Sequence, residues 1–450
     1  MVDYVNADAD NSDVISGVDV QSVLARCDSP DEAVRVALDW VRSAVPTEWL
    51  RAAESDGPSG VRAVRTPEEY RQWYPAFGAS GLVVPTWPVE YGGLGWNSDL
   101  AVAVGRALRP YHLPSLNPLG LNLAAPALFA HGTEEQRLRY LPPIVRNEEV
   151  WCQLFSEPGA GSDLASLSTR ATPSGEDWHI SGQKVWTTWA HLADFGVLLA
   201  RTDPQVPKRE GITYFLIDMH QPGVEVRPLR HIGGEIDFNE VFLDDARVPD
   251  SQRVGAVGTG WKVARATLSG ERQMVSGAGS GGVDRIGGAG ASRLVRLAKE
   301  KATRTQGTGW SDSTVRAAVT RLWAEERMRE WTNQRVRSTL AAGRVPGPES
   351  SIGKVHGSDL NQRIQACAAA LLGEEATTWP AVEGAWDGDI AEAYRQQMPA
   401  EVRGMLRSRA NTIEGGTSEV NKNIIAEKVL GLPREPDSWE GRPWREVPRG

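Results

Sequence analysis

This sequence has few cysteines, no excess of basic residues and no long apolar runs. Each of these features excludes a class of protein. Only three cysteines occur, Cys27, Cys152 and Cys367, far apart and without a Cys-x-x-Cys pair. A disulfide framework or a zinc site is therefore not expected, and a reducing compartment fits best. The net charge is −9, so no basic field is available to hold nucleic acid or an anionic membrane.

Targeting and membrane signals are also missing. Residues 1–8 are acidic where a secretory signal would be basic and then apolar. No apolar run approaches the roughly 18 residues that a transmembrane helix needs. We therefore expect a soluble, cytoplasmic protein. Its 450 residues are too many for one simple core, and this length predicts two or three structural units.

The first region of the chain carries three signals of helix starts. At Ser29, Thr66 and Thr133 a hydroxyl residue is followed three positions later by Glu or Gln, which is the pattern of a capping box. Proline at the next position strengthens the first two signals. Residues 87–95 contain too much Pro and Gly for a helix and are expected to form a loop. The region is therefore predicted to be helical with one irregular connection.

From about residue 150 to 255 the pattern changes to short runs rich in β-branched and aromatic residues. Turn residues such as Gly175 and Gly223 separate these runs. Regular short strands at this spacing predict a compact β-barrel or sandwich. The runs are residues 178–186, 195–200, 212–218, 224–228 and 240–243.

Beyond Gly260 a helical period returns. Apolar residues recur every three to four positions over 317–331, and further helical stretches cover 353–372 and 420–430. The predicted fold is therefore α+β. Its expected segments are a flexible acidic tail (1–20), an N-terminal helical domain (21–149), a middle β-domain (150–255), a C-terminal helical bundle (256–433) and an irregular tail (434–450).

Three motifs carry a resemblance to a known family. Residues 151–163, Trp-Cys-Gln-Leu-Phe-Ser-Glu-Pro-Gly-Ala-Gly-Ser-Asp, contain a glycine-rich turn whose uncovered backbone N–H groups can donate hydrogen bonds to phosphate or carbonyl oxygens. The other motifs are 182–188, Gly-Gln-Lys-Val-Trp-Thr-Thr, and 408–420, which leads into 423–433. With smaller segments at 132–136 and 255–264, they resemble the acyl-CoA dehydrogenase family, in the right order from about residue 65 to 435.

The resemblance implies FAD as cofactor and the oxidation of an acyl-CoA thioester to its trans-2-enoyl form. It also implies a helical N-terminal domain, a middle β-barrel domain and a C-terminal four-helix bundle, with an electron-transferring flavoprotein as acceptor. No metal is expected. The residues implied for FAD are Gln153, Phe155, Ser156, Gly161, Ser162, Trp186, Thr188, Thr417 and Glu419, and those implied for substrate are Ser162, Ser269 and Arg272.

This chemistry needs a base for the α-proton, an acceptor for the β-hydride and hydrogen-bond donors at the thioester carbonyl. In many family members the base is a glutamate just before the Gly-Thr of the C-terminal signature, but here that position is Gly415, and Glu414 lies one residue too early. Another branch places the base in a helical Glu-Arg pair, which Glu271-Arg272 matches. We expect Glu271 to be the base, the Gly415 N–H to bind the carbonyl and Arg272 to lie near CoA or the base. Glu414 as base, or no base, are the alternatives.

The sequence departs from the family pattern in two segments. By the resemblance, both segments would contact the FAD bound to the neighbouring subunit. Residues 301–310 lack the usual Phe-Gly, and the Phe-Gly-Gly segment is reduced to residues 371–375, Leu-Leu-Gly-Glu-Glu. This resembles a bacterial subgroup with heteromeric members. The alternatives are a catalytic homo- or hetero-oligomer, a non-catalytic or FAD-sharing subunit, and a flavin oxidase or monooxygenase on the same scaffold. CoA and a carrier protein are both open as the thioester carrier.

Glycines near Glu271 support two further interpretations. Residues 277–282, Gly-Ala-Gly-Ser-Gly-Gly, satisfy the GxGxxG pattern, but no strand precedes them, so a Rossmann site is not expected. Gly270, Gly277 and Gly279 leave room for a bulky acyl chain. The sequence does not identify that acyl group.

Overall fold

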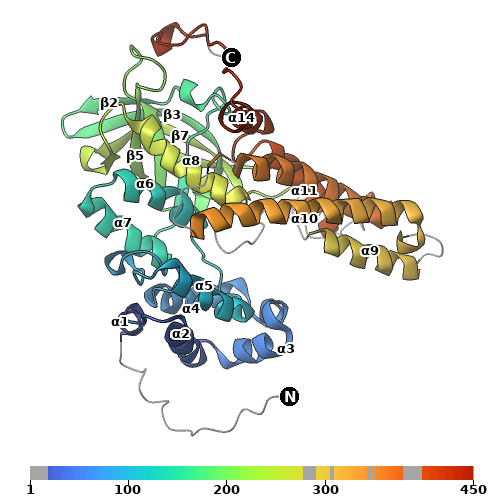
Figure 1. Cartoon of the computed structure of the whole chain (residues 1–450). Helices are drawn as coiled ribbons and strands as arrows, with labels where there is room; N and C mark the ends of the chain where they lie inside the picture. Colours follow the sequence, from blue (N-terminus) through green and yellow to red (C-terminus); the bar gives the residue numbers. More distant parts are fainter. Residues whose placement is uncertain are drawn as a thin grey trace, which may run out of the picture. The chain divides into compact units, whose positions relative to one another are not determined.

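The computed structural model describes residues 19–276, 290–304, 309–341, 347–348, 350–378 and 398–448 (Figure 1). The chain divides into two compact units. One contains the chain up to Leu121 together with residues 133–150, and the other contains residues 122–132 and 151–450. Within the described residues, no helix is long and apolar enough to cross a membrane. Gly277–Gly282 and the acidic segment up to residue 18 lie outside these ranges.

The first unit is helical, as predicted. The Ser29 hydroxyl accepts a hydrogen bond from the Glu32 amide, and at Thr66 and Thr133 both halves of the capping box are present. These caps satisfy amide groups that the first helical turn leaves without partners. The helices are α1 (Val20–Ala25), α2 (Pro30–Ala44), α3 (Thr47–Val64), α4 (Pro67–Ala79), α5 (Ser98–Leu108) and α7 (Glu134–Arg146).

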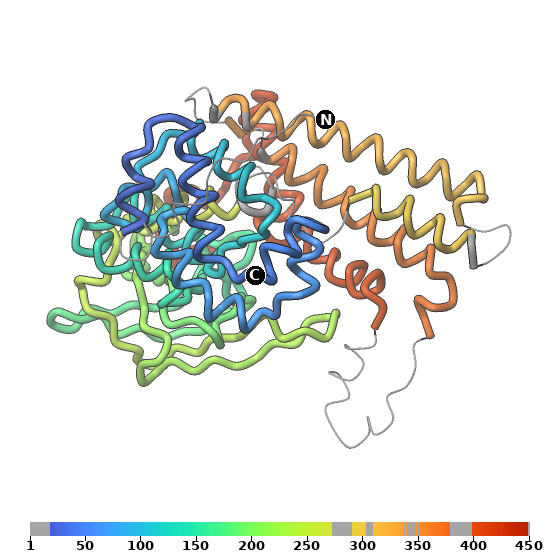
Figure 2. The backbone as a smooth tube through the Cα atoms, turned by 90° about the horizontal axis from the view of Figure 1, so that it is seen from below, coloured from blue at the N-terminus to red at the C-terminus, as the bar shows by residue number. Residues whose placement is uncertain are grey.

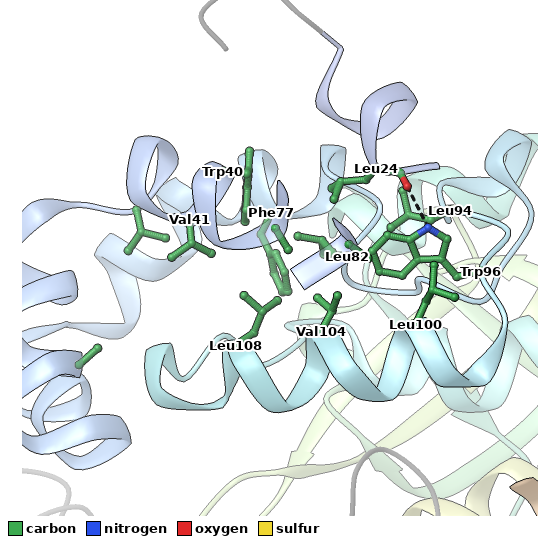
Figure 3. Packing of buried hydrophobic residues seen from close by; sticks show 14 of the residues in the cluster. Leu24, Trp40, Val41, Phe77, Leu82, Leu94, Trp96, Leu100, Val104 and Leu108 are labelled. Atoms are coloured by element: carbon green, nitrogen blue, oxygen red, sulfur yellow. Dashed lines mark hydrogen bonds between the residues drawn. The ribbon is translucent and has the colours of Figure 1, made fainter. Parts of the chain in front are cut away.

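The core of this unit is built around large aromatic side chains (Figure 3). Trp40 stacks on Phe77 with ring centroids 6.2 Å apart. Trp96 is also buried, and its indole N–H donates to the Leu24 carbonyl at 2.9 Å (Figure 3). A buried indole N–H needs such a partner, so this bond fixes the end of α1 against the loop that carries Trp96. The predicted loop at 87–95 is irregular except for a short 3₁₀ turn, Val89–Tyr91.

The five predicted strand runs correspond to β3, β4, β5, β6 and β7 of one connected eight-stranded sheet in the second unit, and β1, β2 and β8 are not predicted by the sequence. The strand order is β6-β7-β3-β2-β4-β5-β8, and β1 pairs in parallel with β4. The buried face holds Leu198, Phe215, Val241 and other apolar side chains. The strands are β1 (Trp151–Leu154), β2 (Arg170–Ser174), β3 (Asp177–Thr188), β4 (Phe195–Arg201), β5 (Ile212–Asp218), β6 (Val224–Leu229), β7 (Phe238–Pro249) and β8 (Arg253–Val254).

Helices return after the sheet. The stretch predicted at 317–331 lies within α10, the stretch at 353–372 is α11, and the stretch at 420–430 is α14 followed by a π turn, Ile425–Val429. The long helices α10 and α11 lie side by side in both views (Figures 1 and 2) and share an apolar core with α9. The helices of this unit are α6 (Ala125–His131), α8 (Gly260–Ser276), α9 (Ala291–Arg304), α10 (Ser313–Ala341), α11 (Ser350–Leu372), α13 (Ala400–Arg407) and α14 (Ser418–Ile424).

The predicted fold class is confirmed: the structure is α+β, with helical N- and C-terminal regions and a sheet domain between them in the sequence. The segment after Pro433 contains a 3₁₀ turn, Trp444–Glu446. Trp444 is only 9% exposed, although residues 431–442 are all exposed. The C-terminal segment is therefore irregular but anchored at one buried side chain.

Candidate active site

The glycine-rich turn predicted to bind a cofactor follows β1 directly. Gln153 is half-buried in β1, and Phe155 is buried with its ring edge-to-face against Tyr214, at 6.0 Å between centroids. Paired backbone hydrogen bonds between Glu157 and Ala160, of 3.1 and 3.0 Å, close the turn. Gly161 and Ser162 follow and are exposed, as backbone donors for a ligand must be.

A buried ion pair joins this turn to β3. Lys184 Nζ lies 2.8 Å from the Glu157 carboxylate and also donates to the Phe155 carbonyl at 3.0 Å, and the Lys184 side chain is 0% exposed. Burial raises the pKa of Glu157, but Lys184 and hydrogen bonds from Thr169 and Ser168 outweigh it and lower that pKa to about 2. The pair is therefore charged and ties the predicted cofactor turn to the sheet.

Trp186 stands on a β-bulge next to this turn. The register of β3 and β7 shifts between Lys184 and Thr187, and Trp186 has a left-handed φ of 60°. Its side chain is 55% exposed and meets Phe238 edge-on at 5.6 Å, and the adjacent Val185 amide donates to the Ser156 carbonyl at 3.0 Å. A bulky residue in this conformation costs about 1–3 kcal/mol, so it points to a functional constraint.

Glu271 lies on α8, half-buried, and its carboxylate is bound from the sheet. Gln153 Nε2 donates to Glu271 Oε2 at 3.3 Å, which joins β1 to α8. Ser269, two residues earlier, is also half-buried on α8. Arg272 continues the same helix, and the structure describes only its backbone. The strand of the first motif and the predicted base are thus in direct contact.

Gly270 does not leave room for a bulky acyl chain, so that interpretation is wrong. A Cβ built at Gly270 would lie 1.9 Å from the Asn122 carbonyl oxygen and 3.3 Å from Pro126. The space is filled by the segment at α6, which packs closely on α8. Gly277 and Gly279 lie outside the described residues.

Replacing Gly270 by alanine is therefore expected to destabilise the fold by about 1–3 kcal/mol, because the added methyl group overlaps backbone. Gly105→Ala is the matched control. Gly105 is an exposed glycine within α5, with nothing within 4 Å of its missing Cβ, so alanine there should be neutral or slightly stabilising. Urea unfolding midpoints of the two variants measure the difference, and equal midpoints would contradict the close packing.

Glu414, the alternative base, has a cationic partner. Its carboxylate lies 2.8 Å from Arg407 Nη2 and accepts from Asn411 Nδ2 at 2.8 Å. Arg407 also lies over the ring of Phe238, 5.7 Å from its centroid, and Phe238 is the neighbour of Trp186. The C-terminal signature and the exposed tryptophan are therefore linked through Arg407 and Phe238.

A buried lysine to which the sequence did not point contacts the C-terminal signature. Lys354 on α11 is 1% exposed and donates to Ser358 Oγ at 2.9 Å and to the Asn411 carbonyl. Burial lowers the pKa of Lys354, while the charges of Glu414 and Glu271 raise it. Lys354 thus holds the C-terminal signature loop at Asn411. The same helix also carries Asp359 and Arg363, so local pattern alone does not distinguish Lys354 from a surface position.

The C-terminal signature continues as two left-handed glycines. Gly415 and Gly416 have φ values of 63° and 86°, a region that side chains with a Cβ avoid. Thr417 then caps α14 by accepting from the Val420 amide at 3.2 Å, and Glu419 is exposed in the first turn. The backbone conformation therefore favours glycine, rather than glutamate, at position 415.

The candidate site contains the exposed ring of Trp186 on a strained backbone, an exposed glycine-rich turn and the half-buried carboxylate of Glu271. All three lie within the second unit. Thr188, half-buried, ends the strand that carries Trp186. Among the residues that the structure describes, no group of His, Cys, Asp or Glu is placed to hold a metal ion. These groups suit an organic cofactor with a flat ring system and an anionic part.

Comparison with known proteins agrees with this site. Residues 32–148, 152–246 and 258–430 match the family models of the acyl-CoA dehydrogenase N-terminal, middle and C-terminal domains. Acyl-CoA dehydrogenase IpdE1 of Mycobacterium tuberculosis is 36% identical over 403 residues, which cover 88% of this chain and 96% of the relative. Acyl-CoA dehydrogenase FadE34 of the same organism is 40% identical over 370 residues, 82% of this chain and 47% of that protein.

Solved structures give the same result. The Tcur3481-Tcur3483 steroid ACAD superposes with a TM-score of 0.66 at 26% identity, covering 92% of this chain and 100% of that one. The ChsE4-ChsE5 complex from Mycobacterium tuberculosis gives a TM-score of 0.65 at 27% identity, with coverages of 94% and 100%. The chain therefore belongs to the acyl-CoA dehydrogenase family, whose members are enzymes that generally depend on FAD.

Proposed function

We propose that this chain binds FAD and removes two hydrogens from an acyl-CoA thioester, with Glu271 as the base that takes the α-proton. The observation that carries the assignment is the hydrogen bond between Gln153 and Glu271, because it links the strand of the flavin-binding motif to the helix of the predicted base. A carboxylate in this position can act as the general base for the α-proton, and the Gln153 amide orients it.

Glu414 suits this role less well than Glu271. Its carboxylate is engaged by Arg407 and Asn411, and these contacts would have to break before Glu414 could approach a substrate. Glu271 accepts a hydrogen bond from the Gln153 amide, which orients its carboxylate relative to the strand of the predicted flavin-binding motif.

The remaining residues are assigned by position. FAD, when bound, would accept the β-hydride at its N5 atom. Trp186 and Thr188 would contact its ring. Gln153, Phe155, Ser156, Gly161 and Ser162 would form the turn beside it, and Thr417 and Glu419 would hold its adenosine part. The Gly415 N–H would donate to the thioester carbonyl and stabilise the developing enolate, with Ser162, Ser269 and Arg272 near the substrate.

The acyl group is proposed to be bulky and polycyclic. The support is the similarity to the Tcur3481-Tcur3483 steroid ACAD, at 26% identity over 92% of this chain. An oligomer is proposed as well, and the similarity to the ChsE4-ChsE5 complex supports a hetero-oligomer. Large side chains exposed on α10, Trp323 at 46% and Trp331 at 65%, offer apolar surface for a subunit contact. An electron-transferring flavoprotein is the proposed acceptor.

The test is the visible absorption spectrum of the purified chain, followed by anaerobic addition of acyl-CoA thioesters of increasing bulk. We expect stoichiometric flavin and bleaching of its long-wavelength band by a polycyclic acyl-CoA, with little bleaching by butyryl-CoA. A folded protein that takes up no FAD, alone or mixed with a related chain, would contradict the proposal. Rapid reoxidation by oxygen of the flavin after chemical reduction, with no thioester present, would indicate an oxidase or monooxygenase instead.

A further inference from the structure

The C-terminal segment contacts the chain immediately after the predicted cofactor turn. The Trp444 amide donates to the Val206 carbonyl at 2.9 Å and the Arg445 amide to the Pro204 carbonyl at 3.2 Å. Pro443 and Pro207 form an antiparallel bridge. Backbone pairing therefore fixes the position of residues 443–445 on the loop between β4 and β5.

The Trp444 side chain reaches from this anchor to the segment at 164–167. Its indole N–H donates to the Ser166 carbonyl at 3.3 Å, and its ring lies 4.3 Å from the guanidinium of Arg201. Arg201 is 3% exposed and donates to the Ala165 carbonyl at 2.7 Å and the Leu167 carbonyl at 3.0 Å. Three consecutive carbonyl groups, of residues 165, 166 and 167, are thus held by one tryptophan and the arginine beneath it.

This segment continues directly from Gly161 and Ser162. Asp163 ends the exposed turn, and its carboxylate accepts from Lys208 Nζ at 2.9 Å. The Lys208 carbonyl in turn accepts from Arg201 at 3.1 Å. The exposed turn is therefore connected at its C-terminal side to a buried network that Trp444 completes. Neither glycine-rich turns nor exposed loops keep one conformation without such support.

We propose that Trp444 is a positioning residue that holds the 161–163 turn in its ligand-binding conformation. This inference rests on the proposed function, because it takes FAD as the ligand of that turn. The indole contributes a cation–π contact with Arg201 and a hydrogen bond to Ser166. Loss of two such interactions together is expected to change the binding constant for FAD about tenfold. Without the indole, the turn samples other conformations and binds the flavin more weakly.

The test compares three variants of the full-length chain. Trp444→Ala should raise the Kd for FAD about tenfold, while Trp444→Phe, which keeps a ring over Arg201, should stay within about threefold. Trp439→Ala is the matched control, because Trp439 lies in the same segment but is 42% exposed. Its Kd should equal that of the wild type. A chain ending at Pro433 should show the same rise in the Kd for FAD as Trp444→Ala. Agreement of the two would show that loss of the Trp444 contacts, rather than a packing defect caused by the alanine, weakens binding.

Hydrogen exchange provides a reading that does not need the ligand. The Ser166 amide donates to the Asp163 carbonyl at 2.9 Å, and the Leu167 amide donates to the Leu164 carbonyl at 3.1 Å. The exchange rates of these two amides therefore report the opening of the segment that follows the 161–163 turn. Trp444→Ala should accelerate them about tenfold and leave the β5 amides unchanged. If Trp444→Ala and the shortened chain match Trp439→Ala in both exchange and FAD affinity, the inference is wrong. A wild type that binds no FAD refutes the proposed function, and the exchange of Ser166 and Leu167 then decides the role of Trp444.

Discussion

Replacing Glu271 by glutamine is expected to leave FAD bound and to slow its reduction by acyl-CoA by at least about 10³-fold. The amide cannot take the α-proton, and a positioned base contributes about 10²–10⁴-fold to such a step. Flavin binding should persist because Gln153 can still donate to the oxygen of the new side chain. Anaerobic stopped-flow measurement of flavin bleaching gives the rate, and the absorption spectrum gives the flavin content.

Glu414→Gln is the matched control for this substitution. It removes the ion pair with Arg407 but keeps a hydrogen-bonding group of the same size, so the reduction rate should fall less than about tenfold. If Glu414→Gln abolishes reduction and Glu271→Gln does not, the base is Glu414. Normal reduction by both variants would show that neither carboxylate is the base.

The second large effect is expected at Lys184. Lys184→Met should lower the free energy of unfolding by about 3–5 kcal/mol, because it leaves the Glu157 carboxylate buried without its counter-charge. The variant should also lose affinity for FAD, since Lys184 holds the Phe155 carbonyl within the flavin-binding motif. Arg227→Gln serves as control, because its pair with Glu225 is 55% and 59% exposed and should contribute less than about 1 kcal/mol.

The effect of Lys184→Met should depend on pH in a defined direction. The pKa of Glu157 is lowered from 4.5 to about 2, so the stabilisation from its charged form is present above pH 4.5 and is lost as the pH falls towards 2. The difference in stability between wild type and variant should therefore shrink over that range. Urea unfolding at several pH values measures it, and a difference that grows on acidification would contradict the charged pair.

The sequence predicted the fold class, five of the eight strands and three capped helix starts, because those features depend on local periodicity and capping. The placement of Glu271 and Gly415 in one active site is also a prediction from the sequence, but it depends entirely on the family resemblance. The pairing of Glu157 with Lys184 and of Lys354 with Asn411 was not predictable, since these contacts join residues 27 and 57 positions apart. Local patterns do not encode such distances.

Two other features show where sequence patterns mislead. Gly270 was interpreted as space for substrate, whereas the structure places the Asn122 backbone there. A missing side chain therefore indicates a close approach, and only the fold shows what approaches. The segment after Pro433 is irregular, as its composition indicates, yet Trp444 bonds to Ser166, 278 positions earlier in the chain. Nothing in its Pro-rich composition indicates that partner.

The most direct test of the proposed function is the identity of the product. The chain, loaded with FAD and supplied with a polycyclic acyl-CoA and an artificial electron acceptor, should convert the thioester to a product lighter by two hydrogen atoms, with a new α,β double bond. Mass spectrometry and the absorbance of the enoyl thioester detect it, and Glu271→Gln should yield none. A product that has gained oxygen would contradict the account. So would an unchanged thioester, provided that the chain binds FAD and that its flavin accepts electrons from a chemical reductant.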